Sequence, residues 1–152
     1  MTGTIETMSD SPSAISRELG YYRVIGAILS AVFAAVGMCF LFIPDEVTLV
    51  FNVFSRQWGM AETPVGGPGF FLILGVAYMY VVAYLAYLMY RTPANVQSLE
   101  VLIQAKSASS ILSFLLFIFL RHYLIYLANG IIDGAIALGL LLLRVKWKGL
   151  WQ

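Results

Sequence analysis

The sequence predicts an all-α integral membrane protein: a four-helix bundle with both termini in the cytoplasm and an interfacial helix in the first outer loop. Of its 152 residues, 61% are apolar and only 11% are charged, whereas soluble domains average about 25% charged residues. The mean hydropathy is +0.86. This composition excludes a water-soluble globule, a disordered chain and a disulfide-stapled secreted domain.

Four apolar stretches carry the prediction of four membrane-spanning helices. They are Val24–Ile43, Gly69–Tyr90, Val101–Leu120 and Leu124–Leu143, of 20, 22, 20 and 20 residues. About 20 helical residues cross a hydrocarbon core of about 30 Å. Membrane strands are about ten residues long and alternate in polarity, so no strand reading competes.

Start signals extend two of these stretches. Ser11 with Pro12, and Thr92 with Pro93, each place a capping hydroxyl before a proline at the first helical position. We therefore expect a cytoplasmic tail with a short surface helix over residues 1–22, and a third span that begins near Pro93. The membrane domain is expected at 23–144, with helices at about 23–43, 69–90, 93–120 and 124–144, and a cytoplasmic basic and tryptophan-bearing tail at 145–152.

The long first loop, Pro44 to Pro68, has a helical pattern of its own. Val47, Val50, Phe51, Phe54 and Trp58 fall on one helical face, which predicts an amphipathic helix lying on the outer leaflet. An irregular turn at 63–68 follows it. The alternative is a packed loop that only connects two spans.

Basic residues set the predicted orientation. Six of them, Arg17, Arg23, Arg91, Arg144, Lys146 and Lys148, flank the spans on the side of the termini, and two, Arg56 and Arg121, lie on the other side. Because cytoplasmic loops carry the excess of basic residues, both termini are expected in the cytoplasm.

The sequence lacks the residues that several classes of functional site require. Cys39 is the only cysteine and His122 the only histidine, so an internal disulfide, a haem held by two histidines and a zinc site are not expected. The net charge of +1 gives no case for a nucleic-acid partner. We expect His122 to be a solvated residue of the outer turn, with quinone or proton exchange as the alternative role.

Asp133 is the ionisable residue of greatest interest. It lies ten residues beyond Tyr123, about 15 Å into the membrane, where a carboxylate needs a polar partner inside the bundle. We expect a buried polar cluster of Tyr80, Tyr84, Ser110, Ser113, Asn129 and Asp133. Three roles are open for this cluster: tying helices together, binding a ligand or substrate, and coupling proton movement. The tyrosines could equally face lipid.

Lys106 is expected at the inner membrane interface rather than in an ion pair with Asp133. Helical side chains lean toward the N-terminus of their own helix, so the two residues lean in opposite directions. Pairing across the hairpin also places Lys106 beside residue 139, about 9 Å from Asp133 along the helix axis. Lys106 is therefore expected to snorkel to the headgroups.

Small residues recur at four-residue spacing and predict close helix contacts. Gly26, Ser30 and Ala34 do so in the first span, and Gly130 and Gly134 in the fourth. The contact can lie within this bundle or with another subunit.

Several of these features resemble the DoxX-like small four-helix membrane proteins of bacteria. They are Arg23 and Gly26 opening the first span, Pro44 ending it before a long loop, Gly75 in the second span, and Asp133–Gly134 before the last leucine run. The resemblance covers most of residues 20–145. It implies a bundle in the bacterial inner membrane and, in some members, a subunit of a quinone-linked oxidoreductase. No residue matches a known catalytic position of that family.

Three functional hypotheses from different classes follow. The first, which we favour, is a non-catalytic accessory or anchoring subunit that contacts lipid and other membrane subunits or further copies of itself, and borders a quinone or lipid. The second is a small proton-coupled transporter that uses Asp133, and the third is a lipid-modifying membrane enzyme. Neither a resident cofactor within the chain nor a metal site is expected.

The orientation can be tested with reporter fusions. A reporter that is active only in the cytoplasm should be active when fused after Gln152 and inactive when inserted at Gly66, because the excess of basic residues lies on the side of the termini. A C-terminal reporter that is active only outside the cytoplasm would reverse the orientation.

Overall fold

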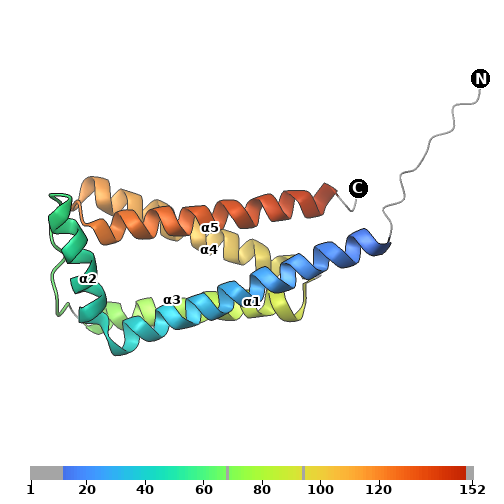
Figure 1. The fold of residues 1–152 in the computed structure, drawn as a ribbon, viewed down its shortest axis with the longest axis horizontal. Helices are drawn as coiled ribbons and strands as arrows, with labels where there is room; N and C mark the ends of the chain where they lie inside the picture. Colours follow the sequence, from blue (N-terminus) through green and yellow to red (C-terminus); the bar gives the residue numbers. More distant parts are fainter. Residues whose placement is uncertain (1–11, 68, 94, 150–152) are drawn as a thin grey trace, which may run out of the picture.

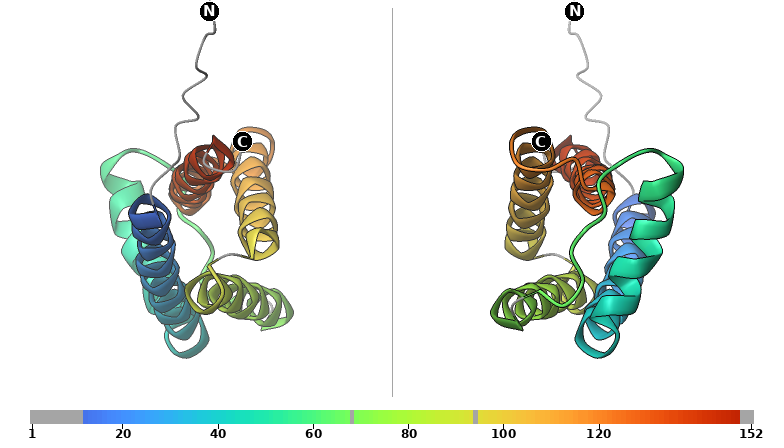
Figure 2. Two further views of the ribbon diagram at one scale, coloured as in Figure 1. Left: turned by 90° about the vertical axis from the view of Figure 1, so that its right-hand side faces the viewer. Right: turned by 90° about the vertical axis from the view of Figure 1, so that its left-hand side faces the viewer.

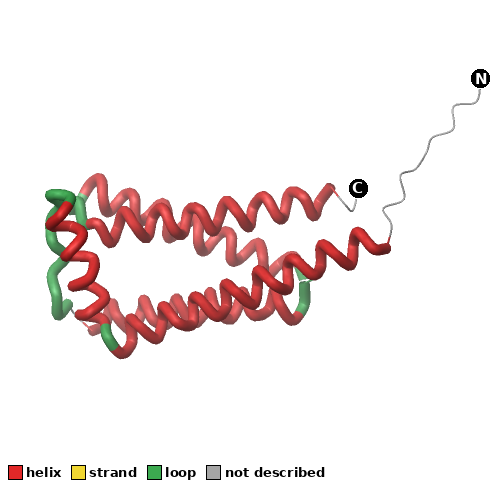
Figure 3. Tube along the Cα trace, in the orientation of Figure 1, coloured by secondary structure: helices red, strands yellow, loops and turns green. Residues whose placement is uncertain are grey.

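The computed structural model describes residues 12–67, 69–93 and 95–149, and within these it consists almost entirely of helix (Figure 3). The helices are α1 (Pro12–Phe42), α2 (Pro44–Gln57), α3 (Gly69–Arg91), α4 (Val96–Phe119) and α5 (Leu124–Gly149). Four segments are long and apolar enough to cross a membrane: Leu19–Phe42, Leu72–Arg91, Val96–Phe119 and Leu124–Lys146. The predicted all-α membrane bundle is confirmed.

One helix begins at its expected proline, and another begins later than expected. The surface helix and the first span form one continuous helix, α1, which begins at Pro12; the expected cap, Ser11, lies outside the described residues. α4 begins at Val96 instead of near Pro93, because Asn95 caps it by accepting a hydrogen bond from the Gln97 amide. The Thr92 hydroxyl instead donates back to the carbonyl of Leu88, 2.9 Å away at the end of α3.

The four long helices form a ring in the order α1, α3, α4, α5 (Figure 2). Within this ring, α1 packs along α3 and α4 packs along α5. The two pairs approach one another where α1 starts and α5 ends, and they separate toward the other end, where α2 lies across the gap (Figure 1). We call these the closed end and the open end of the bundle.

Small residues bring the backbones of α1 and α3 close together. A Cβ atom added to Gly26 would lie only 2.8 Å from the Ala86 carbonyl oxygen and 2.8 Å from the Tyr90 amide nitrogen. One turn further along α1, the Ser30 hydroxyl donates to the carbonyl of Ala83 at 3.0 Å. The predicted small-residue face of the first span therefore packs within this bundle.

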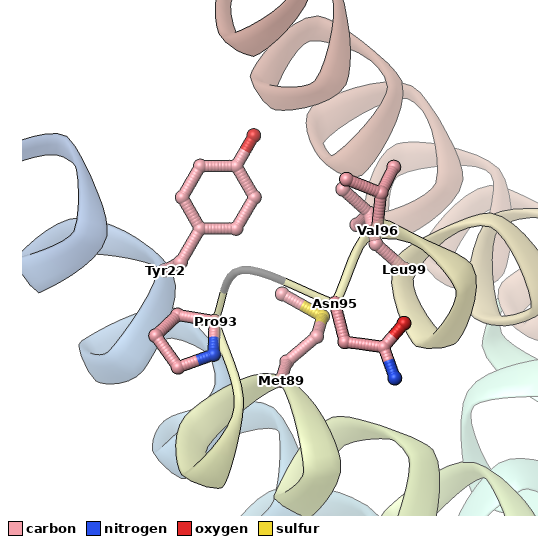
Figure 4. A pocket seen from close by; sticks show the side chains of 6 residues that line it. All are labelled: Tyr22, Met89, Pro93, Asn95, Val96 and Leu99. Atoms are coloured by element: carbon pink, nitrogen blue, oxygen red, sulfur yellow. The ribbon is translucent and has the colours of Figure 1, made fainter. Parts of the chain in front are cut away.

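Side chains fill the closed end. Tyr22 of α1, Leu99 and Leu102 of α4 and Leu140 of α5 belong to one buried core with residues of α3. Figure 4 shows Tyr22 of α1 near Pro93 and Asn95, and the space that these residues line leaves no room for a water molecule. The Tyr22 hydroxyl donates to the carbonyl of Leu143 at 2.7 Å, which joins α1 to α5.

The first loop closes over the open end through polar contacts. α2 begins with Pro44 and carries Asp45 in its first turn, where a carboxylate is favourable at the helix N-terminus. Its buried Asn52 side chain both donates to and accepts from the backbone of Thr63, at 2.9 and 2.8 Å. Ala61 then forms an isolated bridge with Tyr123, between α4 and α5. The loop is thus tied to α2 and to the opposite helix pair.

The close contact at Gly26 yields a stability prediction. Gly26→Ala should lower the free energy of unfolding by about 2 kcal/mol, because the added methyl group overpacks against the α3 backbone. In the control Gly20→Ala, the new Cβ meets open space in the same helix, so stability should stay equal or rise by up to about 1 kcal/mol. SDS-induced unfolding in dodecylmaltoside micelles measures both, and equal effects would contradict the packing described here.

Candidate functional site

A buried ion pair lies in the middle of the bundle. The Lys106 ammonium of α4 donates to Oδ1 of Asp133 in α5 at 2.8 Å, and the two residues are 0% and 3% exposed. The same ammonium lies 4.2 Å from the centre of the Phe33 ring and 5.4 Å from that of Tyr78. One cation therefore contacts all four membrane helices, since Phe33 belongs to α1 and Tyr78 to α3.

This pair corrects the prediction that Lys106 snorkels to the interface. Ser110 packs against Gly130 and Gly134: its hydroxyl donates to the Gly130 carbonyl at 2.7 Å, and a Cβ on Gly134 would lie 2.8 Å from its oxygen. This contact places Lys106 within about one turn of Asp133, less than the expected offset. The long lysine side chain spans the remaining distance of about one turn along the helix axis, against the usual lean of helical side chains toward the N-terminus.

Asp133 keeps one oxygen without a partner. Its Oδ2 is buried and has no hydrogen-bond partner among the described residues. A lone carboxylate at this depth costs about 2.5–3.5 kcal/mol on insertion scales, so pairing with a cation is what makes the position tolerable. The pair as a whole is electrically neutral, yet it retains a free acceptor.

The other predicted polar residues of α4 and α5 lie one to two turns further toward the open end. The Asn129 amide of α5 donates to the hydroxyl oxygens of Ser109 and Ser113 in α4, at 3.2 and 2.8 Å. The structure therefore brings Ser110, Ser113, Asn129 and Asp133 to one seam between α4 and α5. It pairs Asn129 with the serines and not with Asp133.

Tyr80 and Tyr84 do not belong to this cluster. They are 72% and 51% exposed, on the face of α3 that points away from the bundle. The inward tyrosine is Tyr78, whose hydroxyl donates to the carbonyl of Ala105 at 3.0 Å. Tyr78 shares a helical face with the buried Val82 and Met89, so the spacing of those apolar residues was the signal that pointed to it.

A cavity of about 500 Å³ lies between the helix pairs at the open end. Ser109, Ser113, Asn129 and Tyr126 contribute polar groups on the α4–α5 side, and Tyr78 on the α3 side. Apolar walls come from Phe40, Leu72, Val76, Met79, Leu116 and Ile125. Asp45 and Thr48 of α2 line the cavity where the first loop closes over it. The cavity thus runs from the first loop to within a turn of the buried ion pair.

A second hollow, of about 310 Å³, lies on the outside of the bundle between α2 and α5. Phe51, Phe54 and Trp58, three of the five residues of the predicted interfacial face, form its α2 wall. Phe54 and Trp58 are 47% and 63% exposed, so this apolar face remains open beside α5.

His122 lies exposed in the turn between α4 and α5, with its ring centre 5.1 Å from that of Phe117. It lines neither hollow. Within the described ranges, no three His, Cys, Asp or Glu side chains are grouped closely enough to hold a metal ion.

Known family profiles, curated protein sequences and solved structures give no match to this chain. Inference about function therefore rests on the buried pair and on the cavity beside it.

The ion pair predicts a specific pattern in a double-mutant cycle. Lys106→Met and Asp133→Leu should each lower the free energy of unfolding by about 3–5 kcal/mol, because each strands a buried charge. The double variant should recover part of that loss, with a coupling energy of about 2 kcal/mol.

The exposed pair of Arg56 and Glu62, at 3.5 Å, serves as the control for this cycle. Its coupling should stay below about 1 kcal/mol, because water screens both charges. Additive effects of Lys106→Met and Asp133→Leu in the same SDS titration would contradict a direct buried pair.

Proposed function

We propose that this multi-pass membrane protein holds an amphiphilic molecule, a lipid or a quinone, in the cavity at the open end of the bundle. The observation that carries the proposal is the cavity itself. Its volume of about 500 Å³ falls in the range of about 300–1,000 Å³ that is typical of small-molecule sites. Its walls are mostly apolar, with a few polar groups that lie mainly on the α4–α5 wall, as is typical of small-molecule sites.

The hydrogen-bonded side chains of Ser109, Ser113 and Asn129, here called the polar seam, give such a molecule a defined orientation. The Ser109, Ser113 and Asn129 side chains lie together on the α4–α5 wall, so a headgroup hydrogen-bonds there while its apolar part contacts the α1 and α3 walls. Hydrogen bonds are electrostatically stronger in this apolar surrounding than in water.

A binding role agrees better with these residues than a catalytic one. Lys106 and Asp133, the charged pair within a turn of the polar seam, are engaged with one another. We therefore retain the hypothesis of a non-catalytic accessory or anchoring subunit. Open apolar faces such as that of Phe54 and Trp58 on α2 offer contact area to lipid or to another subunit.

One observation favours a second candidate function, proton-coupled transport. Oδ2 of Asp133 has no hydrogen-bond partner in the described part of the chain, and its neighbour on α5, Asn129, lines the cavity one turn away. A change in the protonation of Asp133 alters its bond to Lys106 and, through Phe33 and Tyr78, the contact between the helix pairs. The transport hypothesis predicts that Asp133→Asn folds but loses transport, whereas a binding protein keeps its ligand in this variant.

Filling the cavity tests the binding proposal. Gly75 lines the cavity and a Cβ there meets open space, so Gly75→Phe should project a ring into the site without disturbing the helix contacts. Native mass spectrometry of the purified protein should detect a retained amphiphile, at least about tenfold less in Gly75→Phe because overpacking costs more than about 1.4 kcal/mol of binding.

Gly139→Phe is the matched control, since Gly139 is also a helical glycine with open space and does not line the cavity. It should retain the amphiphile like the unaltered protein. Equal retention by both variants, or no retained molecule in any, would refute the proposal. A stoichiometric protein that co-purifies would support the accessory role.

A further inference from the structure

The charge of the cavity wall restricts what the cavity can hold. Of the described residues that line it, none is Lys, Arg or His, and one, Asp45, carries a carboxylate. Asp45 lies at the rim, where its side chain accepts a hydrogen bond from the Gly66 amide at 3.1 Å. An anionic headgroup that enters from this end therefore meets a negative charge first.

The nearest cation to the polar seam is not available to such a headgroup. Lys106 is 0% exposed and its ammonium is already paired with Asp133 at 2.8 Å. Tyr78, which lines the cavity, has its ring centre 5.4 Å from the same ammonium. A phosphate in the cavity would be a buried anion without a counter-charge, which is costly.

The polar groups that remain suit an uncharged partner. In the bonds from Asn129, the oxygens of Ser109 and Ser113 act as acceptors. The Ser113 hydroxyl keeps its own proton to donate, whereas the Ser109 hydroxyl also hydrogen-bonds with Tyr78. The Asn129 amide oxygen is an acceptor in the same wall. An uncharged hydroxyl donor beside an uncharged amide acceptor is complementary to a carbonyl or a hydroxyl group of a ligand.

We infer that the cavity selects an amphiphile with an uncharged headgroup that bears carbonyl or hydroxyl oxygens, and that it rejects phosphate-bearing lipids. The inference rests on the proposed binding function and narrows it. Diacylglycerols and isoprenoid quinones share this headgroup chemistry, although one comes from phospholipid and the other from the respiratory pool.

Probes with identical tails isolate the headgroup. We would measure binding of dioleoylglycerol and dioleoylphosphatidic acid to the full chain in phosphatidylcholine nanodiscs, with ubiquinone-2 as a second uncharged probe. At least one uncharged probe should bind about tenfold or more tightly than dioleoylphosphatidic acid, which corresponds to about 1.4 kcal/mol. Whether the glycerolipid or the quinone binds identifies the source.

Variants assign this preference to the cavity. Gly75→Phe should abolish binding of the uncharged probe, and Gly139→Phe should not. Asp45→Lys should raise the affinity for phosphatidic acid severalfold, because it replaces the negative charge at the rim by a positive one. Glu46→Lys, a charge change at the next residue, which is exposed and does not line the cavity, should raise it less.

The outcomes separate the inference from the function on which it rests. Equal or tighter binding of dioleoylphosphatidic acid, lost in Gly75→Phe, would overturn the inference and leave the binding function intact. Binding of no probe, or binding that Gly75→Phe does not reduce, would overturn both. Equal effects of Asp45→Lys and Glu46→Lys would overturn the electrostatic selection at the rim.

Discussion

The arrangement of the four membrane helices depends on how one buried lysine side chain is paired inside the bundle. The Lys106 ammonium has a carboxylate on α5 and aromatic faces on α1 and α3 as neighbours. An ammonium group in hydrocarbon is stable only with an anion and polarisable surfaces around it. Because these three partners belong to three helices, all four spans must converge at this level of the membrane.

The two halves of the bundle differ on either side of this point. Toward the closed end, Gly26 allows α1 to approach α3, and Tyr22 joins α1 to α5, so the interior is filled. Toward the open end the helix pairs separate and α2 lies across them (Figure 1). The cavity is the direct result, since the side chains on its walls do not reach across the wider gap. A binding site and a packed core thus share one bundle.

The sequence sufficed for the parts of the fold that depend on one helix at a time. Span length is set by the thickness of the bilayer and can be counted, and the face of α2 follows from its 3.6-residue period. Prediction of the site also required the rotation of each helix and the register between neighbouring helices. Whether Tyr78 or Tyr80 faces inward depends on how α3 is rotated, and the reach of Lys106 depends on where Ser110 meets Gly130 and Gly134. Both are set by contacts between helices that a single sequence pattern does not contain.

The short connection between α4 and α5 has a consequence for biosynthesis. Only residues 120–123 separate the two helices, and each helix carries one charge that is unfavourable alone in lipid. On insertion scales a lysine or an aspartate at the centre of a span costs about 2.5–3.5 kcal/mol. The two charges cancel once the helices are antiparallel neighbours. The translocon therefore handles α4 and α5 most readily as one hairpin that partitions into lipid after both helices have been synthesised.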